Sequence, residues 1–368
     1  MRRSREDRGV RVGVFGATGL VGRELLTLLA ERRFPIESLR VFASSRRAGS
    51  SLDRADRRDL RLEDPEGADL ASIDVALLAC GADASRRLVP MLLEAGATVI
   101  DCSSAFRHEP DVPLVVPEIN GGLLESDPPP RLIACPNCST AIALMAVEPI
   151  RRAAGIARMT ICTYQAVSGA GAAALAELES QVGEHAAGRH SEPRHFRSPC
   201  LFNVFSHESP TDLHGENQEE TKIRSESRRI WNDPTLAVSA TCVRVPTRRA
   251  HAEAINLTLE RSLSPEEARS LLADAPGVVL FDRSPGSRPP EPRDAEGRDE
   301  VLVGRVRADP SQPPGRGLWL FAVADQLRKG AALNAVQIAE RLAPRSIRRQ
   351  QRGMASFTTD ASTSAHRS

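Results

Sequence analysis

The chain has 368 residues, which is enough for two domains that each bury their own hydrophobic core. Its 49 Lys and Arg residues against 48 Asp and Glu residues leave a net charge of +1, so no overall field favours a nucleic acid or a membrane surface as partner. The odd number of cysteines, seven, argues against a disulfide framework. The chain starts with charged residues that no apolar segment follows, which argues against a signal peptide, and no run of about 18 apolar residues is present to span a membrane. We therefore expect a soluble cytoplasmic protein with free thiols.

The first predicted unit is a strand, a glycine-rich turn and an amphipathic helix. The strand covers residues 10–15, and the helix continues through Ala30. Glycine lets the backbone turn tightly and approach a pyrophosphate, which the helix N-terminus then receives. Gly13, Gly16 and Gly19 follow each other at three-residue spacing, a variant of G-x-G-x-x-G. The position of this turn between a strand and a helix favours nucleotide binding over a purely structural turn.

The loop after the second predicted strand, residues 39–43, indicates which nucleotide is bound. In NAD enzymes an acidic residue at this point binds the ribose 2′-hydroxyl. Here Ser44, Ser45 and Arg46 follow the strand, and residues 38–52 contain no carboxylate. Hydroxyl and guanidinium groups suit a 2′-phosphate, so we expect NADP; the alternative is an exposed basic loop.

Strands then alternate with helices. Residues 73–80 and 97–101 are predicted to be buried strands, with a helix up to Ala95 between them. This alternation predicts a parallel, doubly wound α/β sheet, in which ligands bind at the carboxyl ends of the strands. Arg107 follows the second of these strands, so it is either an anion ligand or an ordinary surface arginine.

Cys138 is the candidate nucleophile. Residues 131–135 form a predicted strand, Pro136 and Asn137 break it, and Ser139 opens a nearly all-apolar helix. Unpaired N–H groups and the helix dipole at this terminus are expected to lower the thiol pKa and to favour a nucleophilic thiolate. The alternatives are an inert buried cysteine and, because Cys135 and Cys138 form a C-x-x-C, a redox dithiol.

The second half of the chain has a different pattern. Residues 159–167 and 248–259 alternate like strands. His185, His190 and His195 lie among proline and arginine at spacings that match no metal motif, so we expect a solvated loop and no metal. Residues 282–300 are expected to form an exposed insertion, and residues 346–368 a disordered tail.

Two places in this half carry candidate functional side chains. Glu219 and Lys222 are three residues apart on a predicted helix and therefore project from one face. The Glu219 carboxylate suits a substrate ammonium and the Lys222 ammonium suits a phosphate; the alternative is a surface ion pair between the two residues. His251 begins a predicted strand, where it is a candidate general base, although a lone histidine is more often structural.

A series of motifs then leads to a known family. In order they are GATGLVG at 16–22, DCSSAFR at 101–107, VPEIN at 116–120, PNCST at 136–140, YQAVSGAG at 164–171, GENQEETK at 215–222, CVRVPT at 242–247, VGRVR at 303–307 and LRKGAALNAVQIAE at 327–340. Through them residues 10–342 resemble the aspartate-β-semialdehyde dehydrogenase family. The resemblance implies an N-terminal doubly wound, Rossmann-like parallel sheet plus an α+β catalytic and dimerisation domain. It implies an NADP-binding domain at residues 10–138 completed by a helix at 330–344, a second domain at 139–329, tails at 1–9 and 346–368, and a homodimer or homotetramer.

The resemblance also implies a role for each matching residue. Cys138 would be the nucleophile, His251 the acid and base, and Gln165 the residue that orients the intermediate. The substrate would be bound by Glu219 at its amino group, by Arg244 at its carboxylate, and by Arg107, Asn137 and Lys222 at its phosphate. NADP would contact Gly16, Thr18, Gly19, Leu20, Val21, Ser44, Ser45, Arg46, Ser168, Gly169 and Gln326.

The implied reaction is the reversible, NADPH-dependent conversion of L-aspartyl-4-phosphate to L-aspartate 4-semialdehyde through a Cys138 thioester, in the synthesis of lysine and diaminopimelate, threonine, isoleucine and methionine. Two alternatives stay open: an N-acetyl-γ-glutamyl-phosphate reductase-like enzyme and a catalytically silent nucleotide-binding paralogue. The chain departs from its relatives at Ala250-His251-Ala252, where Gly-His-Ser is usual, at Gln326, where Asn is usual, and at Cys135. The first departure bears on how His251 is held, and the last on oxidation of Cys138.

Overall fold

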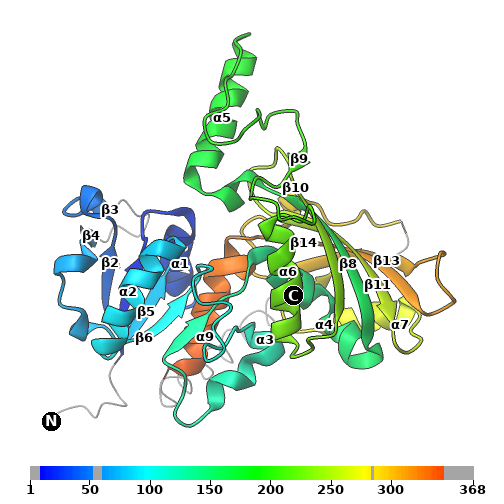
Figure 1. Cartoon of the computed structure of the whole chain (residues 1–368), viewed down its shortest axis with the longest axis horizontal. Helices are drawn as coiled ribbons and strands as arrows, with labels where there is room; N and C mark the ends of the chain where they lie inside the picture. Colours follow the sequence, from blue (N-terminus) through cyan, green and yellow to red (C-terminus); the bar gives the residue numbers. More distant parts are fainter. Residues whose placement is uncertain (1–8, 53–59, 283–285, 344–368) are drawn as a thin grey trace, which may run out of the picture.

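The computed structural model describes residues 9–52, 60–282 and 286–343. Two seven-stranded sheets lie beside each other, one from the first third of the chain and one from the rest, and a helical arm projects beyond the second (Figure 1). The tails expected at 1–9 and 346–368 lie outside the described residues, apart from Gly9. In the described part of the chain, no helix is both long enough and apolar enough to cross a membrane.

The first sheet is the predicted doubly wound sheet. Its strands, in spatial order, are β3 (Ser51–Leu52), β4 (Leu60–Glu63), β2 (Ile36–Phe42), β1 (Val10–Phe15), β5 (Val75–Leu78), β6 (Thr98–Asp101) and β7 (Leu132–Ala134). All neighbours pair in parallel except β3 with β4. The order reverses between β1 and β5, and such a switch point is where this fold binds dinucleotides.

Helices cover both faces of this sheet. α1 (Leu20–Glu31) and the last helix, α9 (Leu333–Leu342), share one core with β1, while α2 (Ala82–Glu94) packs on the other face over the stacked rings of Phe15 and Phe42. α9 therefore brings the end of the described chain back to the first sheet, as the orange helix in Figure 1 shows.

The second sheet is mixed. In spatial order it contains β12 (Val278–Leu280), β13 (Val301–Ala308), β14 (Gly317–Ala324), β11 (His251–Leu259), β8 (Ile156–Gln165), β10 (Ala237–Arg244) and β9 (Phe205–Ser206). α4 (Cys138–Ala154), α6 (Gln218–Ile230) and α7 (Pro265–Ala273) share its largest apolar core. α5 (Ala172–Ala186) forms the arm, and α3 (Pro117–Asn120) and α8 (Pro292–Ala295) are single turns.

The described residues of the insertion expected at 282–300 are mostly exposed, but its second half is anchored to the rest of the fold. Ala295 is fully buried, the Gly297 N–H donates to Asp325 at 2.7 Å, and Asp299 pairs with Arg328 at 2.9 Å. Composition does not reveal these contacts, because their partners, Asp325 and Arg328, come from a later part of the chain. A π-helical turn, Arg328–Ala332, leads into α9.

Candidate active site

Cys138 is the first residue of α4, as the strand-break-helix pattern predicts. Pro136 and Asn137 end the strand, and the Asn137 amide oxygen accepts hydrogen bonds from the N–H groups of Ser139 (2.9 Å) and Thr140 (3.2 Å). The Cys138 side chain lies against Gly330, where a Cβ atom would come within 2.7 Å of the Cys138 Cβ. Cys138 keeps partial exposure to solvent, so a substrate can reach it.

The prediction of a lowered thiol pKa is wrong for this structure. Desolvation, together with the negative charge of Glu219, raises the pKa of Cys138 to about 12, and Arg107 offsets only part of the shift. The backbone N–H of Ser139 at the helix terminus also lowers the pKa of Cys138, but by less than burial and Glu219 raise it. With a pKa this high, Cys138 is a neutral thiol in the resting site.

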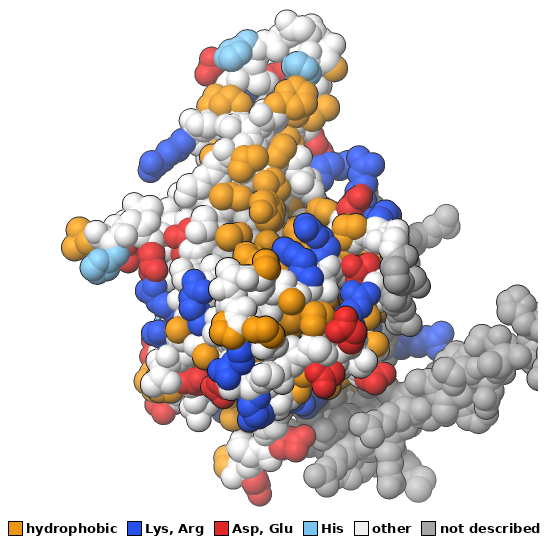
Figure 2. Space-filling view, turned by 90° about the vertical axis from the view of Figure 1, so that its right-hand side faces the viewer, with side chains coloured by type: hydrophobic (Ala, Val, Ile, Leu, Met, Phe, Trp, Pro, Cys, Tyr) orange, Lys and Arg blue, Asp and Glu red, His pale blue; other side chains and the backbone are white. Residues whose placement is uncertain are grey.

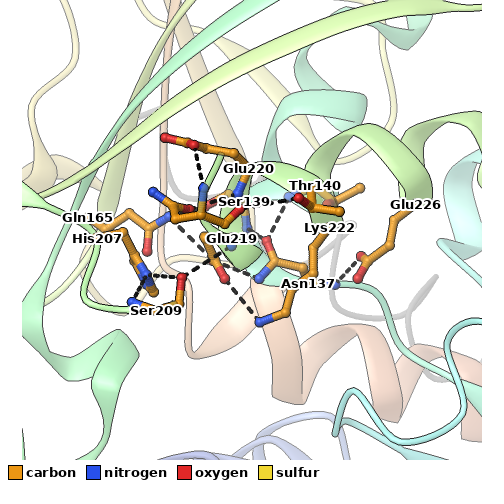
Figure 3. Close-up of polar contacts among 12 residues, drawn as sticks. Asn137, Ser139, Thr140, Gln165, His207, Ser209, Glu219, Glu220, Lys222 and Glu226 are labelled. Atoms are coloured by element: carbon orange, nitrogen blue, oxygen red, sulfur yellow. Dashed lines mark hydrogen bonds and ion pairs between the residues drawn. The ribbon is translucent and has the colours of Figure 1, made fainter. Parts of the chain in front are cut away.

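Glu219 is the centre of the polar network beside Cys138 (Figure 3). Its carboxylate accepts from Asn137 Nδ2 at 2.7 Å, Lys222 Nζ at 3.3 Å and Gln165 Nε2 at 3.4 Å. Burial alone would raise the pKa of Glu219, but the charges of Lys222 and His207 and the Asn137 hydrogen bond lower it to about 2. The site thus keeps one buried carboxylate ionised, which suits a cationic group of a ligand.

Arg107 lies at the carboxyl edge of the first sheet, as expected, and is buried. Its Nη1 pairs with Glu226 at 3.1 Å, and its Nε and Nη2 donate to the carbonyl oxygens of Cys135 (2.9 Å) and Cys102 (3.0 Å). Glu226, on α6, also accepts the Asn137 backbone N–H at 2.6 Å. No local sequence pattern marks Glu226 as a site residue, because only the fold brings it to the end of β7.

Three neighbouring strands of the second sheet contribute one row of polar side chains. Gln165 on β8 pairs with Arg244 on β10, and the register of β11 with β8 places His251 next to Gln165. All three side chains are buried. The register of β11 is what places the His251 side chain in this row, because a shift by one residue would turn it to the opposite face of the sheet.

The hydrogen bonding of His251 fixes its tautomer. The Ala166 N–H donates to Nδ1 at 3.1 Å, so Nδ1 carries a lone pair. Burial and the charge of Arg244 lower the pKa of His251 to about 3, so the ring is neutral and its single proton is on Nε2. Nε2 is buried without a hydrogen-bond partner among the described residues, and a Cβ at Gly169 would lie 3.0 Å from it. His251 therefore presents a hydrogen-bond donor to the space beside Gly169.

Arg244 is fully buried and already paired. It donates to the Ala166 carbonyl at 2.8 Å and forms a two-point ion pair with Glu208, at 2.6 and 3.2 Å. His207 Nε2 lies 3.0 Å from the same guanidinium. Glu208 and His207 come from the loop between β9 and α6, and nothing in their local sequence indicated that they would meet Arg244.

The nucleotide-binding candidates lie at the switch point of the first sheet. Gly16 has a φ of +79°, and a Cβ at Gly22 would come within 2.2 Å of the Gly16 carbonyl, so the turn requires glycine at both positions. No side chain caps the N-terminus of α1, in contrast to α4, so its first N–H groups can receive a phosphate. These residues fit a bound dinucleotide. The candidates at this edge are Gly16, Thr18, Gly19, Leu20 and Val21 in the turn and Ser44, Ser45 and Arg46 after β2.

The other nucleotide candidates form a chain of contacts beside His251. Gln326 donates to Ser168 at 2.6 Å and accepts the Ala250 N–H at 2.8 Å. Ala250 has a φ of +68°, which costs a residue with a Cβ about 1 kcal/mol. Two departures from the family pattern, Ala250 and Gln326, thus contact each other directly, and together they hold the start of the His251 strand.

Comparison with known proteins gives a consistent result. The family described as "Semialdehyde dehydrogenase, NAD binding domain" matches residues 11–126, and "Semialdehyde dehydrogenase, dimerisation domain" matches residues 147–329. An aspartate-semialdehyde dehydrogenase of Aquifex aeolicus is 43% identical over 336 residues, which is 91% of this chain and 98% of the relative. The crystal structure of aspartate semialdehyde dehydrogenase II from Vibrio cholerae, complexed with ASA, superimposes with a TM-score of 0.87 at 40% identity, covering 91% of this chain and 98% of that one. An aspartate semialdehyde dehydrogenase with NADP from Candida albicans, at 24% identity and a TM-score of 0.71, shares the fold.

Proposed function

Because the chain belongs to the aspartate-semialdehyde dehydrogenase family, we propose that it catalyses the reversible, NADPH-dependent conversion of L-aspartyl-4-phosphate to L-aspartate 4-semialdehyde and phosphate. The observation that supports this most strongly is the grouping of the Cys138 thiol with an ionised Glu219 and the cations Arg107 and Lys222. A substrate with an ammonium at one end and an acyl phosphate at the other needs these groups around its nucleophile. The product would supply the synthesis of lysine and diaminopimelate, threonine, isoleucine and methionine.

In the first step the Cys138 sulfur attacks the acyl carbon. The S–C bond forms, the bond from that carbon to the phosphate oxygen breaks, and the thiol proton leaves with the phosphate. Arg107, Asn137 and Lys222 bind the departing phosphate, Glu219 binds the substrate ammonium, and Arg244 binds its carboxylate. Since Glu208 already pairs with Arg244, the substrate carboxylate must share or replace that partner.

In the second step the thioester is reduced. Bound NADPH supplies the hydride. His251 donates its Nε2 proton to the carbonyl oxygen, which gives a thiohemiacetal, and Gln165 holds the reacting carbon in place. When the thiohemiacetal collapses, His251 recovers that proton and the C–S bond breaks. One proton from solution then restores the Cys138 thiol.

We propose residues 10–138 with the helix at 330–344 as the NADP-binding domain and residues 139–329 as the catalytic and dimerisation domain. The shared core of β1, α1 and α9 supports this division. Ser168, Gly169 and Gln326 would contact the nucleotide from the second domain, next to His251.

The Arg46→Glu variant tests the preference for NADP. We expect the KM for NADP to rise by about tenfold or more, because a guanidinium–phosphate contact is replaced by charge repulsion, while the KM for NAD changes little. Steady-state kinetics with both nucleotides measure this. The Arg47→Glu variant is the matched control on the adjacent residue, and an equal loss with NADP and NAD in the Arg46 variant would refute the 2′-phosphate contact.

We propose a homodimer. Figure 2 shows hydrophobic side chains gathered in a band that runs from the projecting arm onto the body. α5 and the segment between it and β9 expose large apolar residues, among them Val182 (50%), Phe202 (77%) and Val204 (60%). Apolar surface of this kind usually marks a protein interface, and the match to a dimerisation domain supports a second copy of the chain as its partner.

A phosphate-dependent reduction assay distinguishes the candidate enzymes. We expect NADP reduction with L-aspartate 4-semialdehyde and little with N-acetyl-L-glutamate 5-semialdehyde, because an acetylated amine is neutral and leaves the charge of Glu219 unpaired. Preference for the acetylated compound would reverse the assignment. Binding of NADPH without turnover of either compound would instead identify a catalytically silent paralogue.

A further inference from the structure

Two cysteines outside the proposed chemistry lie side by side at the ends of neighbouring strands. Cys102 follows β6 and Cys135 follows β7, and these parallel strands pair Asp101 with Ala134. The Cys135 N–H donates to the Asp101 carbonyl at 2.8 Å, which is the parallel-ladder bond that places Cys135 opposite Cys102. Residues paired in this way project to the same face of the sheet, so the two thiols face each other.

The backbone separation suits a disulfide. Neighbouring strands lie about 4.8 Å apart, within the range of about 4.4–6.8 Å between the Cα atoms of bonded cysteines. Cys135 is 1% exposed, whereas Cys102 is partly exposed and can meet a small oxidant first. The C-x-x-C partner, Cys138, lies against Gly330 at the start of α4. The fold thus pairs Cys135 with a residue that is 33 positions away in sequence rather than with Cys138.

The same two residues anchor Arg107. Its Nε and Nη2 donate to the carbonyl oxygens of Cys135 (2.9 Å) and Cys102 (3.0 Å), so the guanidinium spans both strand ends. A disulfide brings the two sulfurs to about 2.05 Å from each other, and the peptide units that carry the two carbonyl oxygens would tilt to allow it. The distance between the two carbonyl oxygens would change, and with it the position of the guanidinium.

We propose that Cys102 and Cys135 form an oxidisable dithiol, and that its disulfide weakens the binding of phosphate by displacing Arg107. The second part rests on the proposed function of Arg107. With hydrogen peroxide as oxidant, the Cys102 sulfur takes one oxygen, the O–O bond breaks, and a sulfenic acid and one water result. Cys135 sulfur then attacks the Cys102 sulfur, the S–S bond forms, the S–O bond breaks, and a second water leaves. A dithiol reductant reverses the reaction by exchange.

The environment of the pair predicts how its reactivity depends on pH. The neighbouring Cys135 thiol, burial and the charge of Asp101 raise the pKa of Cys102 well above its ordinary value. Since only the thiolate attacks an oxidant, the rate of oxidation should rise about tenfold per pH unit over the neutral and mildly alkaline range. The pair is therefore stable as thiols at neutral pH and becomes oxidised under strong or sustained oxidant.

Peptide mapping tests the dithiol without relying on catalysis. In the Cys138→Ser variant, which keeps six of the seven cysteines, peroxide should remove two free thiols and yield one linked peptide that joins Cys102 to Cys135. Adding Cys102→Ser should abolish the link. Adding Cys162→Ser should not, because Cys162 is a partly exposed cysteine whose strand neighbours are Thr241 and Ala254. No linked peptide, or one that joins other cysteines, would overturn the proposal.

Kinetics test the connection to Arg107. Sustained peroxide treatment of the protein with Cys138 present should raise the KM for inorganic phosphate about tenfold or more. Dithiothreitol should reverse the effect, and the Cys102→Ser variant should not respond. A complete Cys102–Cys135 link with an unchanged KM would refute the connection. Turnover by the reduced protein tests the proposed function separately, so failure of that function is distinguishable from failure of the dithiol.

Discussion

The Cys138→Ser variant is expected to lose at least about 10³-fold in kcat while its affinity for NADPH stays unchanged. A serine hydroxyl is a much weaker nucleophile than sulfur. His251 is not arranged to activate it as a base, because its Nδ1 is occupied by the Ala166 N–H and its Nε2 carries the proton. The glycine-rich turn proposed to bind NADPH belongs to the first sheet, away from the substitution, so the binding of NADPH should be unchanged. Steady-state kinetics and fluorescence titration with NADPH measure the two effects.

The Cys162→Ser variant is the matched control for this experiment. Cys162 is also a partly exposed thiol, but it lies within β8 and not at a helix terminus. Its replacement should leave kcat within about twofold, the range of ordinary surface substitutions. Normal turnover by the Cys138→Ser variant would remove the nucleophile from the mechanism.

The Glu226→Gln variant is expected to lower both stability and activity. It leaves the buried Arg107 without its charged partner, and breaking a buried ion pair in this way costs about 3–5 kcal/mol. Glutamine still offers an oxygen to the Asn137 N–H, so the start of α4 should keep its geometry. The KM for phosphate should rise about tenfold or more because Arg107 is less firmly held. Denaturant unfolding and steady-state kinetics measure the two effects.

A second ion pair that involves the same helix provides the control. Glu216, which precedes α6, pairs with Arg224 on α6, and both side chains are 30% exposed. Exposed pairs contribute at most about 1 kcal/mol, so the Glu216→Gln variant should change stability little and the KM for phosphate not at all. Equal effects of the two substitutions would show that Glu226 has no special role in holding Arg107.

The parts of the fold that the sequence predicts are those with strong local signals. The glycine turn before α1, the break at Pro136 and Asn137, and the start of β11 at His251 are all found where the local pattern places them. Each depends on a backbone requirement or an alternation that neighbouring residues reveal.

The parts that could not be predicted depend on residues that meet only in the folded chain. Glu226 is 119 positions from Arg107, and Glu208 is 36 from Arg244, so no local pattern links them. The pKa of Cys138 is the clearest case. Its position at a helix N-terminus was predicted, but desolvation and the charge of Glu219, 81 residues later in the chain, decide the direction of the shift.

Intact-mass analysis of the enzyme with its substrate tests the covalent mechanism most directly. When L-aspartate 4-semialdehyde and NADP are supplied without phosphate, an aspartyl thioester should accumulate on one peptide, the one that carries Cys138. Inorganic phosphate should discharge it. An enzyme that turns over the semialdehyde without any such adduct, or with the adduct on another residue, would contradict the Cys138 thioester mechanism.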